Sequence, residues 1–294
     1  LFHLKQATAR TSAVIIHGLS RGTLSNVVDS HWKIHKFGGS SLADDVCFRR
    51  VADLLLESDD TRVGVVVSAM GGMTDALIHL AILAEQDNDK FLQELHAIGD
   101  RYASTARALL SGDRLVSVLD AWGKDAEDIT DVLKAIALVR SAPQRSRDVV
   151  AGYGEIWSAR LLAATLAQAS PGRGGTWIDA REVIVVHQTE LGPSVLWDMS
   201  TENFANAVPA HFEGIAVITG FIATDENGLQ TTLGRNGSDF SAAIFAALSE
   251  ASELTIWTDV DGVMSADPRR VPEAQVIDQL TYNEAMELAY FGAN

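Results

Sequence analysis

Residues 232–239 read Thr-Leu-Gly-Arg-Asn-Gly-Ser-Asp and lead directly into an apolar segment, 240–248, that is predicted to be a helix. Glycine lets such a loop turn tightly and approach a ligand, while the start of the helix offers unpaired N–H groups to an anion. Ser238 is a candidate N-cap. Asp239 suits the positive end of the helix dipole and could also hold a metal or an amine. Taken alone, the loop could also simply cap the helix.

Two more glycine loops follow apolar runs. Lys36-Phe37-Gly38-Gly39-Ser40-Ser41 follows an alternating run at 32–37, and the run 65–67 is followed at 68–75 by Ser-Ala-Met-Gly-Gly-Met-Thr-Asp. Ligands of open α/β sheets bind where the carboxyl ends of the strands meet, so three such junctions predict loops that converge on one site. The sequence contains no GxxxxGK[ST] motif, which excludes a Walker A loop.

The remaining pattern alternates strands with helices. Strands are predicted at 32–37, 62–67, around Trp177, and at 183–186, 215–219 and 254–258; helices are predicted from 74, over 87–140 and from 154 to 169. A last helix opens with the capping box Thr281-x-x-Glu284. This alternation predicts an α/β fold with a mostly parallel sheet and helices on both faces. The strand-free region 87–140 is predicted to be a helical insertion, which could also form a subunit interface.

Composition narrows the class of protein. The chain has 294 residues and a net charge of −16, from 39 acidic and 23 basic side chains, which argues against a nucleic-acid partner. No run approaches the roughly 18 apolar residues of a membrane span. The single cysteine, Cys47, excludes an intrachain disulfide and fits a reducing compartment, so we predict a cytoplasmic protein. Cys47 shares a helix face with apolar residues and is predicted to be a buried structural thiol.

The first 31 residues differ from the rest of the chain. They carry Lys5, Arg10 and Arg21 against one acid, Asp29, and they do not begin with Met. Such a segment could be the remnant of a targeting peptide, in which case the location would be a plastid, or it could be a disordered arm. Residues 32–294 are predicted to form the catalytic domain.

Four motifs, in order along the chain, resemble the signatures of aspartate kinases. They are Lys36 to Ser41, Gly154-Glu155, the loop 232–239, and the segment from Ile256-Trp257-Thr258-Asp259 to Asp267-Pro268-Arg269. The resemblance covers nearly everything from His35 to Asn294. The ending 284–294 and Phe48-x-Arg50-Val51-Ala52-Asp53 favour the class fused to homoserine dehydrogenase. Family members continue into ACT domains and, when fused, a dehydrogenase; this sequence contains neither, and a catalytic-domain fragment is expected.

The resemblance implies the fold of the amino-acid kinases, an α/β/α sandwich. Aspartate would bind in the amino-terminal part, about 32–210, and ATP in the carboxy-terminal part, about 211–294. The implied reaction transfers the γ-phosphoryl group of MgATP to the side-chain carboxylate of L-aspartate, giving 4-phospho-L-aspartate, the first step of lysine, threonine and methionine biosynthesis. The full-length protein is expected to be a homo-oligomer. A carboxylate with a reference pKa of about 3.9 is already ionised at neutral pH, so this nucleophile needs no general base.

The resemblance also implies roles for individual residues on the aspartate side. Lys36 would stabilise the transferring phosphoryl group, and Asp239 would organise the reacting groups. Glu155 would receive the amino group of aspartate, although it could instead be a partner of a helix dipole. Arg235 would clamp a substrate carboxylate, because its planar guanidinium matches a carboxylate with two hydrogen bonds. Ser68 and Thr74 are expected to bind aspartate or phosphate, or else to cap a helix.

The nucleotide side is implied in the same way, and its candidates share a place near the phosphates or the base. They are Gly38, Gly39, Ser40, Thr258, Asp259, Met264 and Arg269. Met264 and Asn294 depart from the family, which often has an aromatic residue and a lysine there. Trp257 is predicted to be part of the core. No protein ligand to Mg²⁺ is predicted, because the ATP phosphates would hold the ion.

Two alternatives remain open. A related amino-acid kinase that acts on glutamate, N-acetylglutamate, carbamate or UMP would share the sandwich and a lysine-glycine loop. A non-catalytic sensor of amino acids or nucleotides could also keep this fold, because a fold alone does not fix function.

Overall fold

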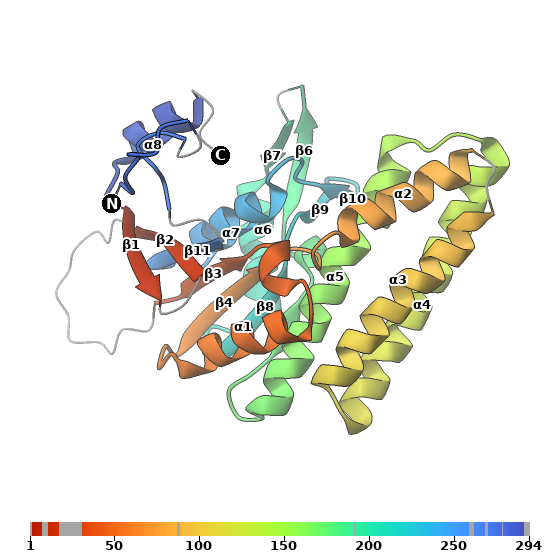
Figure 1. Cartoon of the computed structure of the whole chain (residues 1–294), viewed down its shortest axis with the longest axis horizontal. Helices are drawn as coiled ribbons and strands as arrows, with labels where there is room; N and C mark the ends of the chain where they lie inside the picture. Colours follow the sequence, from red (N-terminus) through yellow and green to blue (C-terminus); the bar gives the residue numbers. More distant parts are fainter. Residues whose placement is uncertain are drawn as a thin grey trace.

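The computed structural model describes residues 2–7, 11–17, 31–86, 89–190, 192–258, 262–267, 270–277 and 279–290 (Figure 1). A sheet of seven strands lies at its centre, in the order β1-β2-β11-β3-β4-β8-β5. The strands are β1 (Phe2–Ala7), β2 (Thr11–His17), β3 (Lys33–Phe37), β4 (Arg62–Val67), β5 (Thr176–Ile178), β8 (Gly214–Thr219) and β11 (Glu253–Thr258).

The five strands from β11 to β5 run parallel, whereas β1 and β2 form an antiparallel pair beside β11. Strands β4 and β8 are almost wholly buried and consist largely of valine and isoleucine, as expected where helices cover both faces of a parallel sheet. The predicted α/β fold with a mostly parallel sheet is confirmed.

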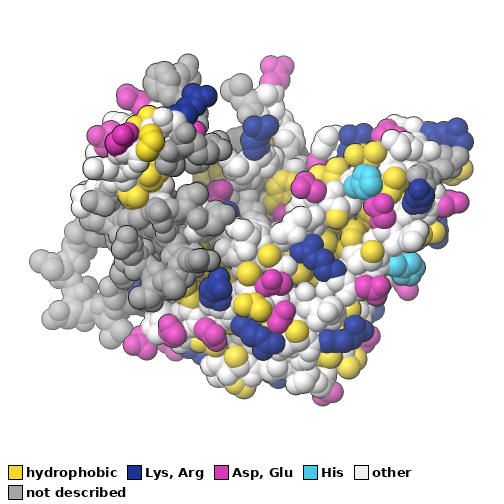
Figure 2. All heavy atoms as spheres, in the orientation of Figure 1, with side chains coloured by type: hydrophobic (Ala, Val, Ile, Leu, Met, Phe, Trp, Pro, Cys, Tyr) yellow, Lys and Arg dark blue, Asp and Glu magenta, His cyan; other side chains and the backbone are white. Residues whose placement is uncertain are grey.

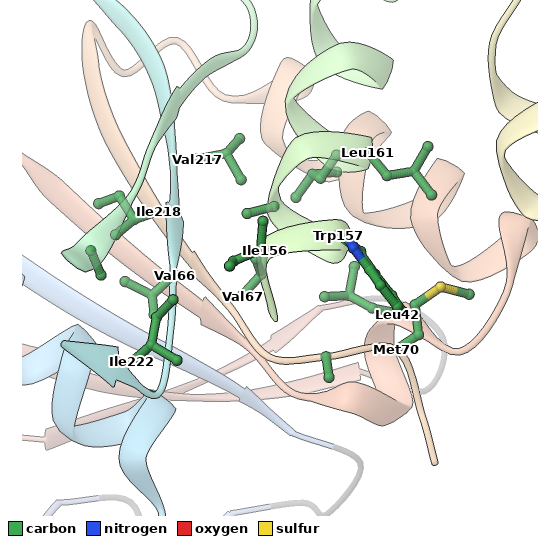
Figure 3. Close-up of a cluster of buried hydrophobic side chains, with 14 of the residues drawn as sticks. Leu42, Val66, Val67, Met70, Ile156, Trp157, Leu161, Val217, Ile218 and Ile222 are labelled. Carbon is green, nitrogen blue, oxygen red and sulfur yellow. The ribbon is translucent and has the colours of Figure 1, made fainter. Parts of the chain in front are cut away.

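Helices cover the two faces of this sheet. In Figure 3, Ile156, Trp157 and Leu161 of α5 (Gln144–Ala169) lie on the side of Val217 and Val67, while Val66 and Ile218 point to the opposite side. Helix α1 (Asp45–Glu57) packs with α5. On the other face, α6 (Trp197–Ala207) and α7 (Gly237–Leu248) meet through the rings of Phe204 and Phe245, whose centroids are 6.1 Å apart. The result is the three-layer sandwich.

A second, smaller sheet has the order β10-β9-β6-β7. It consists of β6 (Val185–Thr189), β7 (Gly192–Val195), β9 (Ile222–Asp225) and β10 (Gln230–Thr232). Because β9 follows β8 closely and β10 leads into the loop 232–239, this sheet carries the chain from the central sheet to the arginine-bearing loop. The sequence patterns did not predict it.

Helices α2 (Met73–Glu85), α3 (Lys90–Leu109) and α4 (Gly112–Val139) form a lobe beside α5 (Figure 1). The strand-free helical region predicted at 87–140 therefore corresponds to α3 and α4. None of the helices in the described part of the chain is long and apolar enough to cross a membrane. Two 3-10 helices, η1 (Gly39–Leu42) and η2 (Ala180–Glu182), and α8 (Tyr282–Tyr290) complete the elements. The predicted capping box of α8 is confirmed, since Glu284 accepts the Thr281 N–H at 2.7 Å.

Three local predictions were wrong. Helix α5 begins at Gln144, so Gly152 and Gly154 lie inside it. Their purpose is close packing: a Cβ on Gly154 would lie 2.8 Å from the Cβ of Ala69. Helix α7 has Asn236 rather than Ser238 at its N-cap, in the left-handed conformation with φ of 57°. Cys47 lies in the first turn of α1 and is only partly buried, because the apolar face of that helix is formed by Phe48, Val51, Ala52 and Leu55.

Two strands lie within the stretch 1–31 that the sequence suggested as an arm. Strand β2 pairs antiparallel with β11 and so extends the central sheet. The apolar, partly β-branched run at 13–16 suits a strand. The interpretation of 1–31 as a targeting segment stays a prediction.

Candidate active site

Two of the three predicted glycine loops begin at one edge of the central sheet. Phe37 at the end of β3 pairs with Val67 of β4, and Val67 pairs with Thr219 of β8. The predicted loops after β3 and β4 therefore start side by side, next to the turn that follows β8. The third predicted loop, 232–239, does not follow a strand of this sheet: it follows β10 of the smaller sheet and reaches the same place from there. Around them lies a cavity of about 460 Å³, a size that suits a small-molecule ligand. It is lined by Lys36, Gly39, Ser68, Ala69, Met70, Gly71, Gly72, Thr74, Asp75, Glu155, Phe221, Gly234, Arg235, Asn236, Gly237, Ser238 and Asp239.

The structure thus brings together all the residues predicted for catalysis and for aspartate binding. They come from the end of β3, the loop after β4, the start of α2, the middle of α5, the loop after β10 and the start of α7. The parallel sheet brings the segments after β3 and β4 to one edge. The seven predicted residues that line the cavity are Lys36, Gly39, Ser68, Thr74, Glu155, Arg235 and Asp239.

The loops after β3 and β4 touch through their backbones. A Cβ on Gly39 would lie 2.9 Å from the carbonyl oxygen of Ala69, and a Cβ on Gly71 would lie 3.1 Å from the carbonyl oxygen of Gly39. Real Cβ atoms do not tolerate the first of these distances. Glycine is therefore needed at these positions because the two backbones pack directly against each other.

An ion pair links the end of β3 to α7. The ammonium Nζ of Lys36 lies 2.8 Å from Oδ1 of Asp239, with 12% and 39% of the two side chains exposed. The predicted place of Asp239 in the first turn of α7 is confirmed. The pair holds the lysine ammonium at the cavity wall, next to Gly38, whose Cβ position would be 3.6 Å from Nζ.

Glu155 is the buried acid of the site. Its residue is 4% exposed, and its Oε2 has no hydrogen-bond partner in the described part of the chain. Burial raises the pKa of its carboxyl to about 8, although the backbone N–H of Ala69 opposes the shift. Because Glu155 lies in the middle of α5, its alternative role as a first-turn dipole partner is excluded. A positively charged group of a ligand would stabilise the ionised form of this carboxyl by pairing with it.

Arg235 stands at the other side of the same cavity. Its side chain is exposed, and it makes no hydrogen bond or ion pair with the residues that the structure describes. The loop presents it through two left-handed residues, Gly234 with φ of 75° and Asn236 with φ of 57°. The guanidinium is thus available for an anionic ligand group.

Sequence reasoning missed one residue of the cavity wall, Phe221. Its φ of 69° is strained for a non-glycine residue. Two hydrogen bonds hold it: Phe221 N–H donates to Ser241 Oγ at 2.9 Å, and its carbonyl accepts from Leu233 N–H at 2.7 Å. The second bond fixes the start of the arginine loop against β9. The only signal in the sequence is a glycine, Gly220, directly after a wholly buried strand.

The sequence matches the amino acid kinase family over residues 31–294. The chain belongs to this family. It is 41% identical over 266 residues to the chloroplastic bifunctional aspartokinase/homoserine dehydrogenase 1 of Arabidopsis thaliana, covering 90% of this chain and 29% of that protein. It is 36% identical to bifunctional aspartokinase/homoserine dehydrogenase 2 of Escherichia coli, covering 89% of this chain and 31% of the relative. The chain thus spans about a third of the length of these curated relatives.

Solved structures of the amino acid kinase family show the same fold. E. coli aspartokinase III in complex with aspartate and ADP superimposes with a TM-score of 0.77 at 31% identity, covering 89% of this chain and 56% of that one. The same enzyme with lysine and aspartate gives a TM-score of 0.74 at 30% identity, covering 89% of this chain and 57% of that one.

Of the described candidates for the nucleotide side, only Gly39 lines the cavity. Ser40 is exposed, Thr258 ends β11, and Met264 forms an isolated bridge with Val276; none of these lines the cavity. Asp259, Arg269 and Asn294 lie outside the described residues. Trp257 stacks on Phe37 with 5.6 Å between centroids and packs against the core, as predicted.

The remaining features of the site concern the charge on the surface and possible metal ligands. Acidic and basic side chains are mixed over the face shown in Figure 2. Among the described residues, no group of three or more His, Cys, Asp or Glu side chains could hold a metal ion by itself.

Proposed function

We propose that the chain is the catalytic domain of an aspartate kinase. It would transfer the γ-phosphoryl group of MgATP to the side-chain carboxylate of L-aspartate and release 4-phospho-L-aspartate. One observation carries this proposal. A single cavity contains the buried carboxyl of Glu155 and the guanidinium of Arg235, neither of which is paired with an opposite charge among the described residues, together with the Lys36–Asp239 ion pair. The names of the relatives and of the solved structures support the same activity.

The first two groups suit an α-amino acid. Its ammonium would pair with Glu155, which is buried and would then ionise, and its α-carboxylate would pair with Arg235. A guanidinium binds a carboxylate in a planar, two-bonded geometry. Ser68 and Thr74 lie on the same cavity wall and would donate hydrogen bonds to the ligand. A ligand that lacks either charge would leave one of the two groups unpaired.

The third group suits phosphoryl transfer. Lys36 would neutralise charge that spreads over the transferring group, and the N–H groups of Gly38, Gly39 and Ser40 would bind its oxygens. Asp239 holds the ammonium in place, so Lys36 would not have to reorient as the charge develops. The side-chain carboxylate of aspartate attacks as the anion it already is, and no side chain has to accept a proton.

Mg²⁺ fits this site as an ion held mainly by the ATP phosphates. The described acids do not form a cage for a metal, and Mg²⁺ commonly binds through one or two carboxylates together with phosphates. Asp239 would be the side chain that faces the ion. Bound in this way, Mg²⁺ supplies positive charge to the phosphates. Thr258, Asp259, Met264 and Arg269 remain proposed nucleotide contacts.

The names of the relatives bear on the cellular location that we propose. The plant relatives are named chloroplastic, which favours the plastid over the cytoplasmic alternative. Fusion of residues 1–31 to a fluorescent protein tests this in plant cells: accumulation in plastids would support a targeting role, and cytosolic fluorescence would remove it. A homo-oligomeric state of the whole protein stays a prediction.

The activity is tested by trapping the acyl phosphate. The polypeptide that contains this sequence is incubated with MgATP and L-aspartate in the presence of hydroxylamine, and both ADP and the hydroxamate are measured. Aspartate-dependent hydroxamate is expected. L-Glutamate and N-acetyl-L-glutamate serve as controls for related amino acid kinases, and product from either of these without product from aspartate would overturn the assignment. Aspartate binding with no ADP release under any condition would indicate a sensor.

A further inference from the structure

One arginine outside the cavity is bonded to both glycine loops. Arg101 lies on α3, a helix that contributes no residue to the cavity wall. Its Nη2 donates one hydrogen bond to the carbonyl oxygen of Ala43 at 3.0 Å and another to that of Gly71 at 2.8 Å. A single amino group of the guanidinium thus connects two backbone segments that come from different strands.

These carbonyls belong to the segments that form the reaction site. Ala43 is the C-cap residue of η1, which begins directly after Gly38 and shortly after Lys36. Gly71 lies between Ser68 and Thr74. The two segments touch there, since a Cβ on Gly71 would lie 3.4 Å from the Cβ of Ala43. Glycines form the contact between these two segments, so no side chain at the contact itself can hold them together. The guanidinium of Arg101, on α3, hydrogen-bonds to both segments and so holds them together.

The turn of α3 that carries Arg101 is itself firmly held. The next residue, Tyr102, is 1% exposed, and its hydroxyl donates to the carbonyl oxygen of Trp157 on α5 at 3.3 Å. The rings of Tyr102 and Trp157 lie 5.8 Å apart. Trp157 follows Glu155 by two residues. One turn of α3 therefore contacts the segment that follows β3, the loop that follows β4, and the helix that carries Glu155.

We propose that Arg101 is a positioning residue for phosphoryl transfer, which rests on the proposed aspartate kinase function. It sets the separation between the segment 36–43, which would hold the phosphoryl group, and the segment 68–74, which would hold the amino acid. Reaction between two bound anions depends on near-contact alignment, and a misplacement of about 1 Å can cost about a hundredfold in rate. A planar, fixed guanidinium suits two carbonyls better than a flexible lysine ammonium does.

Kinetics of three variants test the proposal. Arg101→Met keeps much of the side-chain volume but removes both hydrogen bonds, and Arg101→Lys keeps the charge. Arg107→Met is the matched control, because Arg107 is exposed on the same helix and its side chain makes no hydrogen bond or ion pair with the described residues. We expect kcat to fall about ten- to a hundredfold in Arg101→Met, with smaller changes in the KM values for aspartate and MgATP, and to fall less in Arg101→Lys. The positioning role of Arg101 would be overturned by an unchanged kcat in both Arg101 variants. It would also be overturned if kcat fell as far in Arg107→Met as in Arg101→Met.

Amide hydrogen exchange gives a readout that does not depend on activity. Ser41 N–H donates to Gly38 O at 3.0 Å, and Met73 N–H donates to Met70 O at 2.8 Å, so each loop contains a protected amide. Both amides should exchange faster in Arg101→Met than in the wild type and in Arg107→Met. Exchange at the wild-type rate in both loops would refute the positioning role. If the wild type were inactive, only the proposed aspartate kinase function would fail. The exchange comparison would still test whether Arg101 holds the two loops in place.

Discussion

Lys36 Nζ lies 2.8 Å from Asp239 Oδ1, so the end of β3 and the first turn of α7 meet through opposite charges at the cavity wall. The pair is partly exposed, and such pairs contribute about 0–1 kcal/mol to stability. Its importance is therefore expected in the reaction rather than in folding.

Lys36→Met should abolish most of the turnover and leave the fold intact. Loss of a positioned charge that stabilises a transition state costs about a hundred- to a thousandfold in kcat. Asp239→Asn should also lower kcat, because the amide no longer orients the ammonium. The measurements are kcat with aspartate and the unfolding temperature of each variant. A Lys36→Met protein with normal stability and normal kcat would remove Lys36 from catalysis.

Glu155 should make aspartate binding depend on pH. Its pKa is about 8 in the ligand-free protein, so at lower pH the carboxyl must lose a proton before it can pair with an ammonium. The KM for aspartate should therefore fall as pH rises from about 6 to about 8. Glu155→Gln should raise KM strongly and remove this dependence. Calorimetry should detect proton release when the wild type binds aspartate at neutral pH.

The same residue should lower the stability of the ligand-free protein as pH rises. The folded pKa, about 8, lies above the usual glutamate value of 4.5, so the folded state binds this proton more tightly. The stabilising contribution is fully present below about pH 4.5 and is lost as pH approaches and passes 8. Other groups titrate alike in both proteins, so the unfolding-temperature difference between wild type and Glu155→Gln isolates the effect. A difference that stays constant with pH would contradict the raised pKa.

Arg235→Lys should weaken aspartate binding although the charge is kept. A lysine ammonium cannot reproduce the planar two-bonded contact, and the loss of one hydrogen bond to a charged group corresponds to about 1.5–3 kcal/mol. The KM for aspartate should rise about tenfold or more. Arg114→Lys, at an exposed position on α4, is the control and should leave KM unchanged. An unchanged KM in Arg235→Lys would exclude the clamp.

The sequence predicted the sandwich because parallel strands buried on both faces are short apolar runs that alternate with helices. It predicted that the loops after β3 and β4 meet, because the carboxyl ends of parallel strands lie at one sheet edge. The loop 232–239 reaches the same cavity from the smaller sheet, which the patterns did not predict. It failed at contacts between distant segments. The glycine pattern predicted a helix start at Gly152 and Gly154, whereas both lie inside α5, where side chains such as those of Ile222 and Ala69 pack directly against them. Arg101 had no local signal, since its partners lie 30 and 58 residues away in the sequence.

Gly39→Ala should show how closely the two loops are packed. The new Cβ would lie 2.9 Å from the carbonyl oxygen of Ala69 and 3.4 Å from the Cα of Gly71, and backbone atoms cannot rotate away. Overpacking of this kind costs about 1–3 kcal/mol, and any relief by loop separation should also lower kcat. Gly172→Ala is the matched control, because a Cβ there meets nothing within 4 Å. Its stability should stay close to that of the wild type.

Denaturant unfolding and kcat of both variants check the prediction. Equal behaviour of the two would mean that the loops can separate without loss of function, which would also weaken the role proposed for Arg101.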